Sequence, residues 1–325
     1  MKNKILYLLR RDGNAFISGE SLSETLGVSR TAIWKHIKAL RAEGYIIDSV
    51  TNKGYRLIAE SEGLSGISLN EIIQSYNYLD FSSYHETIDS TNLEAKRRAL
   101  DSEDVQGIII ASEQRGGKGR LGRYWASENK AGLWMSLLIR PNVPPESAAC
   151  ITLVAASSMC KAIEKTTKLN VGIKWPNDLV INGKKCCGIL TEMSAELNHL
   201  HYIVLGIGVN IDQLEFEDDI KDKATSLKLE GAKISAKELL IAFLDAFSDD
   251  YHRFLEMDMA PIIDYHKSHS VTLNKEIIVA SSTGSKIAQA VDLAEDGSLI
   301  IINQNGQLEN VLSGEVSVRG INGYV

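Results

Sequence analysis

The sequence predicts an α+β protein in three parts, because the spacing of its apolar residues changes twice along the chain. Helical spacing and a short hairpin pattern occupy the first 60 residues, and helices alternate with strands from 67 to 270. Short strand-like runs fill 271–325. A chain of 325 residues, 44% of them hydrophobic, is long enough for two or three domains. We therefore expect domains at 1–60, 67–270 and 271–325, the last a small β-barrel.

The first 60 residues predict a winged helix-turn-helix. They hold ten basic and six acidic side chains, a net charge of +4, whereas the whole chain carries -7. After a first apolar helix, a second is expected over Gly19–Leu26, and Ser29 is suited to cap a third that runs to about Glu43. The segments Tyr45–Val50 and Tyr55–Ile58 predict a β-hairpin wing.

The third of these helices has an apolar stripe and a polar face. Ile33, Ile37 and Leu40 fall on the stripe and are expected to face inward. A local basic excess on an acidic chain favours a polyanion partner, here DNA. The residues expected to contact DNA are Ser29, Arg30, Thr31, Trp34, Lys35 and Lys38. A basic protein-interaction domain is the alternative, but the Gly-Val-Ser-Arg turn that enters a basic helix favours DNA.

Cations and glycines are concentrated between residues 115 and 123, after the buried-strand pattern Gly107–Ala111. The cations are Arg115, Lys118, Arg120 and Arg123. The glycine N–H groups can line up on an anion, and arginine forks fit carboxylate or phosphate oxygens. The run is not a P-loop, because Lys118 is followed by glycine rather than by Ser or Thr. A solvated basic loop is the alternative, but the position at a strand end favours an anion site.

Two further stretches suggest a site. Lys174–Asp178 forms a stiff corner that presents an amide and a carboxylate, and Asn182-Gly183 between apolar runs predicts a hairpin. Lys185 then lies at the start of the returning strand, although an ordinary hairpin-end cation is the alternative. Val204–Asn210 predicts a strand with two glycines, a pattern that allows close approach to its backbone.

Taken in order, these stretches resemble the biotin protein ligases. The matching segments are Ser90-Thr91-Asn92, Gln114 with Gly117–Arg123, Lys174–Asp178 with Lys185, and Gly206–Asn210. The first 60 residues extend the resemblance to the bifunctional bacterial type, which is both a ligase and the biotin operon repressor. The resemblance implies a central mixed β-sheet like that of class II aminoacyl-tRNA synthetases and a C-terminal SH3-like β-barrel.

The resemblance also implies a two-step reaction. The carboxylate of biotin attacks the α-phosphate of ATP, with Mg²⁺ as cofactor, and gives biotinyl-5'-adenylate and pyrophosphate. A lysine of the biotin carboxyl carrier protein of acetyl-CoA carboxylase then attacks the mixed anhydride. The same adenylate is expected to act as corepressor, so that a homodimer binds operator DNA.

Site roles follow by the same resemblance. Lys185 and Arg120 are the expected catalytic residues. The expected biotin-binding residues are Ser90, Thr91, Asn92, Gln114, Gly117, Lys118, Gly119, Arg120, Lys185 and Gly206. The expected nucleotide-binding residues are Arg120, Arg123, Trp125, Asn177, Asp178 and Asn210. Gly208 is expected to leave room for the ligand, and Arg319 either reaches the nucleotide or pairs with a neighbour.

Alternatives remain for parts of this reading. Ser90 and Thr91 could be plain helix caps, and Asn177 and Asp178 could form only a structural corner. A DNA-binding sensor that has lost catalysis, or a lipoate- or octanoate-transferring enzyme, would be a rival function. The four cysteines form no C-x-x-C pair, which argues against a metal site or a disulfide framework and favours a reduced cytoplasmic setting. Apolar runs stay short of a membrane span, so no membrane partner is expected.

Overall fold

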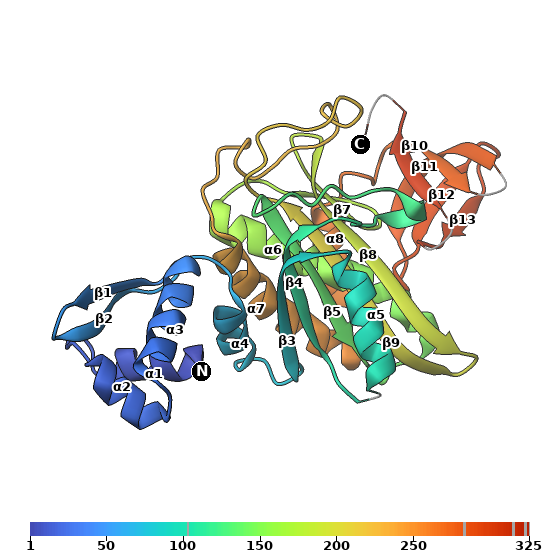
Figure 1. Ribbon diagram of the computed structural model, residues 1–325. Coiled ribbons are helices and arrows are strands. Elements are labelled where there is room, and N and C mark those ends of the chain that lie inside the picture. The colour runs from blue at the N-terminus through green and yellow to red at the C-terminus, as the bar shows by residue number, and fades with distance from the viewer. Residues whose placement is uncertain (103, 282–283, 314–315, 322–323, 325) are drawn as a thin grey trace. The chain divides into compact units, whose positions relative to one another are not determined.

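The computed structural model describes residues 1–325 except 103, 282–283, 314–315, 322–323 and 325. The chain divides into two compact units, Met1–Ile72 and Ile73–Val325. Figure 1 shows a helical unit with a two-stranded hairpin at the N-terminal end of the chain, and a mixed sheet followed by a C-terminal sheet in the rest. The predicted α+β class is confirmed.

The N-terminal unit is a helix-turn-helix with a β-hairpin. Its elements are α1 (Lys2–Arg11), α2 (Gly19–Leu26), α3 (Arg30–Ala42), β1 (Ile46–Val50), β2 (Gly54–Ala59) and α4 (Gly66–Ile73). The hydroxyl groups of Ser18 and Ser29 accept hydrogen bonds from the first turns of α2 and α3, and Gly27 ends α2 in the left-handed conformation. The sequence predicted α2, α3 and the hairpin because their start and stop signals are local.

The core of this unit reaches beyond the hairpin. Ile33, Ile37 and Leu40 of α3 are at most 1% exposed, as the apolar stripe predicted. Ile67 of α4 joins the same core. Arg10 of α1 pairs with both Glu60 and Glu71, with N–O distances of 2.7 Å. The segment predicted as a linker and the helix after it are therefore packed on the N-terminal unit.

A seven-stranded mixed sheet organises the second unit, in the order β3-β4-β5-β9-β8-β7-β6. Only β3 and β4 pair in parallel. The strands are β3 (Phe81–Ile88), β4 (Gly107–Gln114), β5 (Gly132–Ile139), β6 (Gly172–Lys174), β7 (Asp178–Ile181), β8 (Lys184–Glu196) and β9 (His199–Asn210). The hairpin between β7 and β8 turns at Asn182-Gly183 as predicted, with both residues in the left-handed region.

Helices cover both faces of this sheet. In Figure 1 α5 (Thr91–Asp101) lies in front of it, packed on β4, β5 and β9, and α7 (Ala236–Leu255) lies behind. A 3-10 turn η2 (Pro145–Cys150) leads into α6 (Ile151–Thr167), which packs on β6, β7, β8 and α7. The last helix is α8 (Ala260–Ser268). The segment Pro145–Thr167 is long and apolar enough to span a membrane, but 78% of its apolar window is buried inside the protein, as in a core helix.

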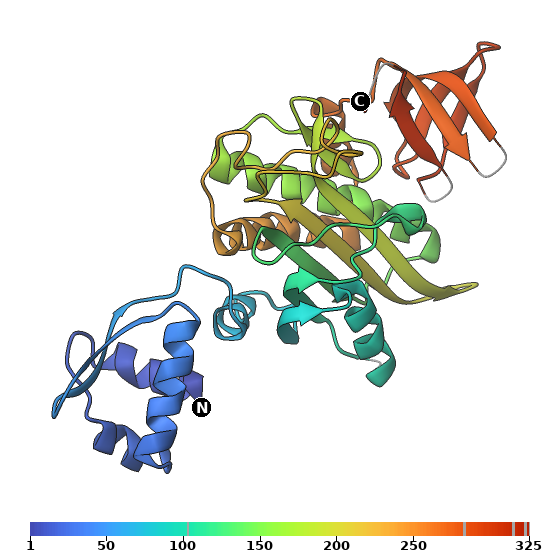
Figure 2. The ribbon, with the colours of Figure 1, turned by 45° about the horizontal axis from the view of Figure 1, so that its top comes forward.

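A five-stranded antiparallel sheet follows, in the order β13-β12-β11-β10-β14 (Figure 2). Its strands are β10 (Glu276–Ser281), β11 (Gly284–Leu293), β12 (Leu299–Asn303), β13 (Leu308–Val311) and β14 (Ser317–Gly320). The strand predicted at Gly314–Val318 begins outside the described residues, and its described part belongs to β14. Gly297 and Gly306 take the left-handed conformation at the two predicted turns. Closure into an SH3-like barrel stays a prediction.

Candidate functional site

Two neighbouring cavities lie at one end of the mixed sheet, and the predicted site residues surround them. The smaller has a volume of about 50 Å³ and the larger of about 820 Å³. The residues that line both are Gly119, Arg120, Trp125, Asn177 and Lys185. The smaller cavity is well below the roughly 300–1,000 Å³ of typical ligand pockets. A ligand that enters it must therefore displace protein side chains.

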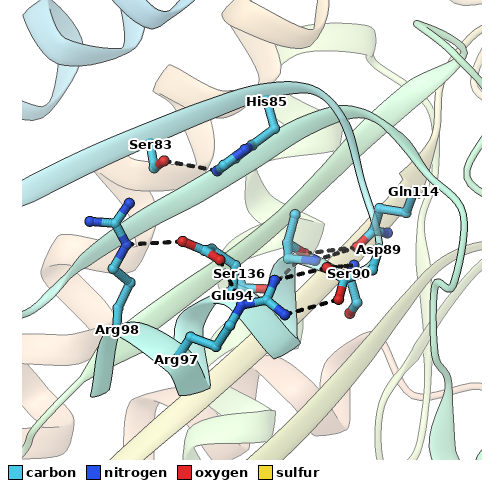
Figure 3. Close-up of polar contacts among 10 residues, drawn as sticks. Ser83, His85, Asp89, Ser90, Glu94, Arg97, Arg98, Gln114 and Ser136 are labelled. Atoms are coloured by element: carbon cyan, nitrogen blue, oxygen red, sulfur yellow. Dashed lines mark hydrogen bonds and ion pairs between the residues drawn. The ribbon is translucent and has the colours of Figure 1, made fainter. Parts of the chain in front are cut away.

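Buried polar side chains form one wall of the smaller cavity (Figure 3). Ser90 occupies the N-cap position of α5, but its side chain makes no capping bond. The Thr91 backbone N–H donates to Gln114 Oε1 at 2.8 Å, and the Thr91 hydroxyl donates to the same oxygen at 3.0 Å. Gln114 Nε2 in turn donates to Ser127 Oγ at 2.8 Å. The plain-cap reading therefore does not account for these side chains, which are fixed by a network that crosses from α5 to β4.

Asn92 connects this network to a charged pair. Its Nδ2 donates to Glu192 Oε2 at 2.8 Å, and Ser136 Oγ donates to its Oδ1 at 2.6 Å. Lys96 Nζ donates to the other oxygen of Glu192 at 2.6 Å. Burial opposes ionisation of Glu192, but the donors Lys96 and Asn92 outweigh it and lower the pKa of this carboxyl. The charged carboxylate thus fixes which way the Asn92 amide faces.

The two glycines of β9 give room to side chains of the site. A Cβ atom at Gly206 would lie 2.1 Å from Asn92 Oδ1, and one at Gly208 would lie 2.4 Å from Trp125 Nε1. Trp125 Nε1 is buried and has no hydrogen-bond partner among the described residues. The space above Gly208 is thus filled by the Trp125 ring, which would have to shift to admit a ligand there.

Lys185 lies where the two cavities meet. Its Nζ is 2.5 Å from Asp178 Oδ1 and 5.0 Å from the centre of the Trp125 ring. Burial opposes ionisation of Asp178, but Lys185 and a hydrogen bond from the Tyr324 hydroxyl lower its pKa below the usual value. The neighbouring Lys184 lines neither cavity. The two adjacent lysines of the hairpin therefore differ in placement, and only Lys185 faces the site.

The Gly/Arg loop is held by its arginine. Arg120, in the short turn η1 (Arg120–Gly122), donates to Asn177 Oδ1 at 3.0 Å and to the backbone oxygen of Val316 at 2.9 Å. Burial lowers the pKa of this guanidinium from its ordinary value, but an arginine stays charged. Asn177 is itself tied to β8, since its Nδ2 donates to Ile189 O at 2.8 Å. Asn177 thus has the structural role that the corner reading allowed, and it also lines both cavities.

Lys174 is a site residue that the sequence analysis named only as part of its motif. It is 6% exposed, lines the larger cavity, and places its Nζ 3.5 Å from the centre of the Tyr324 ring. Burial lowers its pKa to about 8, and Asp178 partly opposes this shift. Tyr324 gave no local signal, because its position depends on how the C-terminal segment folds back.

The remaining predicted residues divide between the cavities. Besides the shared residues, those predicted to bind biotin that line the smaller cavity are Ser90, Thr91, Asn92, Gln114, Lys118 and Gly206. Those predicted to bind the nucleotide that line the larger cavity are Arg123, Asp178 and Asn210, and Arg319 is also there. Gly117 lines neither, and its carbonyl accepts a hydrogen bond from Trp125 N at 3.0 Å. Asn210 Nδ2 donates to Thr225 O at 3.0 Å.

The predicted DNA-contacting residues lie on the outside of α3 and its cap. Ser29, Arg30, Thr31, Lys35 and Lys38 are all exposed. Trp34 is 53% exposed, and Lys38 Nζ lies 5.6 Å from the centre of its ring. Arg30 pairs with Glu20 of α2 at 2.7 Å. A large aromatic ring held on an exposed basic helix face has no role in the core of this unit.

Comparisons with known proteins decide the family. The biotin/lipoate A/B protein ligase family matches residues 84–210, an HTH domain matches 2–56, and the biotin protein ligase C terminal domain matches 272–319. The "Bifunctional ligase/repressor BirA" of Bacillus subtilis (strain 168) is 33% identical over 321 residues, 98% of either chain. The chain belongs to the bifunctional ligase/repressor family. It therefore combines a biotin ligase with a helix-turn-helix repressor domain.

Further similarity supports this assignment. The protein of the same name from Escherichia coli (strain K12) is 30% identical over 311 residues, 94% of this chain and 93% of that one. Among solved structures, "Biotin protein ligase from Aquifex aeolicus in complex with biotin and ATP" has a TM-score of 0.64 and 29% identity. That similarity covers 74% of this chain and 100% of the other. The ligase part of the predicted fold is thus confirmed.

Proposed function

We propose that this ligase/repressor joins biotin to ATP in the two cavities, and that the adenylate is made where the cavities meet. The observation that carries the proposal is the shared wall. The smaller cavity offers a fixed set of neutral donors and acceptors, suited to the ring of biotin, and the larger offers cations and volume, suited to a nucleotide. Lys185 and Arg120 line both, so a carboxylate and an α-phosphate brought together there would lie beside two positive charges.

In the first step a carboxylate oxygen of biotin forms a bond to the α-phosphorus, and the bond to the β-phosphate breaks to release pyrophosphate. The protein supplies position and charge rather than a nucleophile. Lys185 would hold the attacking carboxylate and stabilise the charge that develops on the phosphate oxygens. Arg120, with Lys118, would neutralise the oxygens that carry the negative charge. Asp178 keeps Lys185 charged and in place.

In the second step the amine of an acceptor lysine attacks the carbonyl of the anhydride, loses a proton, and releases AMP. We infer that the acceptor is the biotin carboxyl carrier protein of acetyl-CoA carboxylase. Before that attack, the anhydride needs protection from water. The loop between residues 116 and 123, with Trp125, would cover it, since these residues already form the roof of the smaller cavity.

Mg²⁺ fits the larger cavity as an ion that enters with the nucleotide. Mg²⁺ is usually held by one or two carboxylates together with substrate phosphates and water. Asp178 is engaged by Lys185 and Tyr324, whereas the carboxylates of Glu215, Glu217 and Asp219 are exposed at the cavity. When bound, the ion would neutralise charge on the phosphates.

We also propose that the adenylate is the corepressor, and that the repressor binds operator DNA in the cytoplasm as an adenylate-bound homodimer. The exposed Trp34, Lys35 and Lys38 on α3 support a DNA contact. The assignment keeps domain bounds of 1–60, 67–270 and 271–325 for the DNA-binding domain, the catalytic domain and an SH3-like barrel.

Pyrophosphate release tests the ligase assignment. Mixed with Mg-ATP, the full chain should release pyrophosphate with biotin and not with lipoate, and should then label the carrier protein on lysine. The polar set around Asn92 and Gln114 suits a cyclic urea better than the flexible aliphatic chain of lipoate. Equal release with lipoate would reassign the substrate, and no release with either would leave a sensor without catalysis.

A further inference from the structure

A thiol, a carboxylate, an imidazole and a phenol converge between α6 and α8, outside both cavities of the ligase site. Cys160 and Glu164 are four residues apart on α6 and therefore share a face of the helix. His269 follows the last residue of α8. One ligand atom from each of these three side chains lies within 4.8 Å of the other two. Tyr265 Oη lies 3.1 Å from Glu164 Oε2 and 3.6 Å from Cys160 Sγ.

The hydrogen bonds of His269 determine which ring nitrogen has a free lone pair. Its Nδ1 lies 3.0 Å from the backbone oxygen of Tyr265, which can only accept, so Nδ1 carries a proton. In the neutral ring Nε2 then presents a lone pair, and it lies 3.4 Å from Glu164 Oε2. Glu164 is a ready acceptor, because Val171 N and the Tyr265 hydroxyl both donate to its carboxylate. Two acceptors that face each other repel unless a proton or a cation lies between them.

A cation suits this arrangement. A histidine that binds a metal usually donates its other ring N–H to a carbonyl or carboxylate, as Nδ1 of His269 does. Thiolate, imidazole and carboxylate together are typical of Zn²⁺ and exclude Mg²⁺ and Ca²⁺, which take oxygen ligands. Cys160 is fully buried, whereas the Glu164 and His269 side chains are 28% and 24% exposed, which gives an ion a way in from solvent.

We propose that Cys160, Glu164 and His269 form a Zn²⁺ site, with the Tyr265 hydroxyl or a water molecule as the fourth ligand. Zinc–ligand distances of about 2.0–2.3 Å require these atoms to close in by up to about 1 Å, which rotation of the two half-exposed side chains allows. Cys160 binds as a thiolate, so one proton leaves to solvent on binding. Without the cation, burial raises the pKa of this thiol to about 12.

The ion would connect α6 and α8 to the strand that leads into the ligase site. The His269 carbonyl accepts a hydrogen bond from Ile173 N at 2.8 Å, and Ile173 precedes Lys174 in β6. The site would thus be structural. The positions of its ligands, 105 residues apart in sequence between Cys160 and His269, explain why no spacing motif predicted it.

Co²⁺ provides the test, because a cobalt–thiolate bond gives a charge-transfer absorption band that oxygen and nitrogen ligands do not give. The full chain, reduced with a phosphine and free of chelators, is titrated with Co²⁺. We expect a thiolate band at one equivalent, loss of the band on addition of Zn²⁺, and no change with excess Mg²⁺. Zn²⁺ should also raise the melting temperature of the protein.

Matched variants locate the site. Cys160→Ala should abolish the band and His269→Gln should weaken Co²⁺ binding at least tenfold, on the order of what metal-site substitutions cost. Cys150→Ala is the control, since Cys150 is also buried but lies about 15 Å along the same helix, and it should leave the band unchanged. Absence of a thiolate band in the unaltered chain, or a band that persists in Cys160→Ala, would overturn the proposal and leave a protonated His269–Glu164 ion pair.

Discussion

Arg97 grips Asp89 through two hydrogen bonds, with Nη1 2.9 Å from Oδ2 and Nη2 2.9 Å from Oδ1 (Figure 3). This pair holds the pKa of the Asp89 carboxyl down to about 2. Asp89 Oδ1 also accepts from the backbone N–H of Ser90 at 2.7 Å, and the Asp89 carbonyl accepts from Gly116 N at 2.8 Å. One ion pair on α5 therefore fixes the start of the predicted biotin segment and the start of the Gly/Arg loop.

We expect Arg97→Ala to raise the KM for biotin by about two- to fivefold with a smaller change in kcat, because an exposed pair contributes at most about 1 kcal/mol. Steady-state pyrophosphate release at varied biotin measures both constants. Arg98→Ala is the matched control, because Arg98 pairs with Glu94 and does not contact Asp89. If both variants shift KM equally, the effect belongs to α5 as a whole and not to the Asp89 contact.

The hairpin lysines provide a second matched pair. Lys185→Ala should slow adenylate formation by about 10²–10³, the usual cost of removing one positioned charge aimed at a transition state. Lys184→Ala should stay within about threefold of the unaltered enzyme, which is under about 1 kcal/mol. Single-turnover formation of the adenylate separates this step from transfer. Comparable losses in both variants would place the reacting phosphate elsewhere.

The buried Lys174 predicts a pH dependence of nucleotide binding. Its pKa is lowered to about 8, so the side chain is charged below that pH and neutral above it. Phosphates favour the charged form, and the KM for ATP should therefore be flat below pH 8 and rise up to about tenfold per unit above it. Lys174→Arg, which stays charged, should remove the break in the profile. An unaltered break in this variant would assign the titration to another group.

Local signals explain what the sequence could predict. Ser29 before a basic helix, Asn182-Gly183 between apolar runs and the Gly/Arg run each specify their own conformation within a few residues. By contrast α4, β3 and β13 were missed. The half-buried edge strand β3 has no apolar run, and β13 has only four residues.

The candidate site could be predicted only as far as its motifs reached. Glu192 meets Asn92 across 100 residues of sequence, and Tyr324 reaches Asp178 across 146. Neither pairing follows from spacing, because strand order and the return of the C-terminal segment bring the partners together. The difference between Lys184 and Lys185 likewise depends on the register of β7 and β8.

The packing of α4 predicts how the DNA-binding part should be cut. A fragment of residues 1–72 keeps buried Ile67 and the Arg10–Glu71 pair, which a fragment of residues 1–60 loses. Burial of one isoleucine contributes about 1.5–3 kcal/mol, so the shorter fragment should melt about 10 °C lower. Thermal unfolding followed by circular dichroism measures this. Equal melting temperatures would show that α4 adds nothing to this unit, while the remaining fragment 73–325 should still release pyrophosphate.

The adenylate should control DNA binding through dimerisation. One helix-turn-helix gives a small footprint, and specific repressors usually place two on half-sites about one helical turn, or a multiple of it, apart. A Gly/Arg loop that rearranges over the adenylate could complete a subunit interface. By sedimentation, biotin with ATP should shift the chain toward a dimer and tighten operator binding more than biotin alone.

Lys185→Ala separates synthesis of the adenylate from the response to it. This variant should not respond to biotin with ATP, because it makes the adenylate too slowly, but it should dimerise and bind operator when the finished adenylate is added. Lys35→Ala with Lys38→Ala should do the reverse: it should dimerise normally but bind DNA weakly, with a shallower dependence on salt because fewer phosphates are neutralised. Operator affinity that is the same with and without adenylate would reduce the protein to a ligase with a constitutive DNA-binding domain, whatever its oligomeric state.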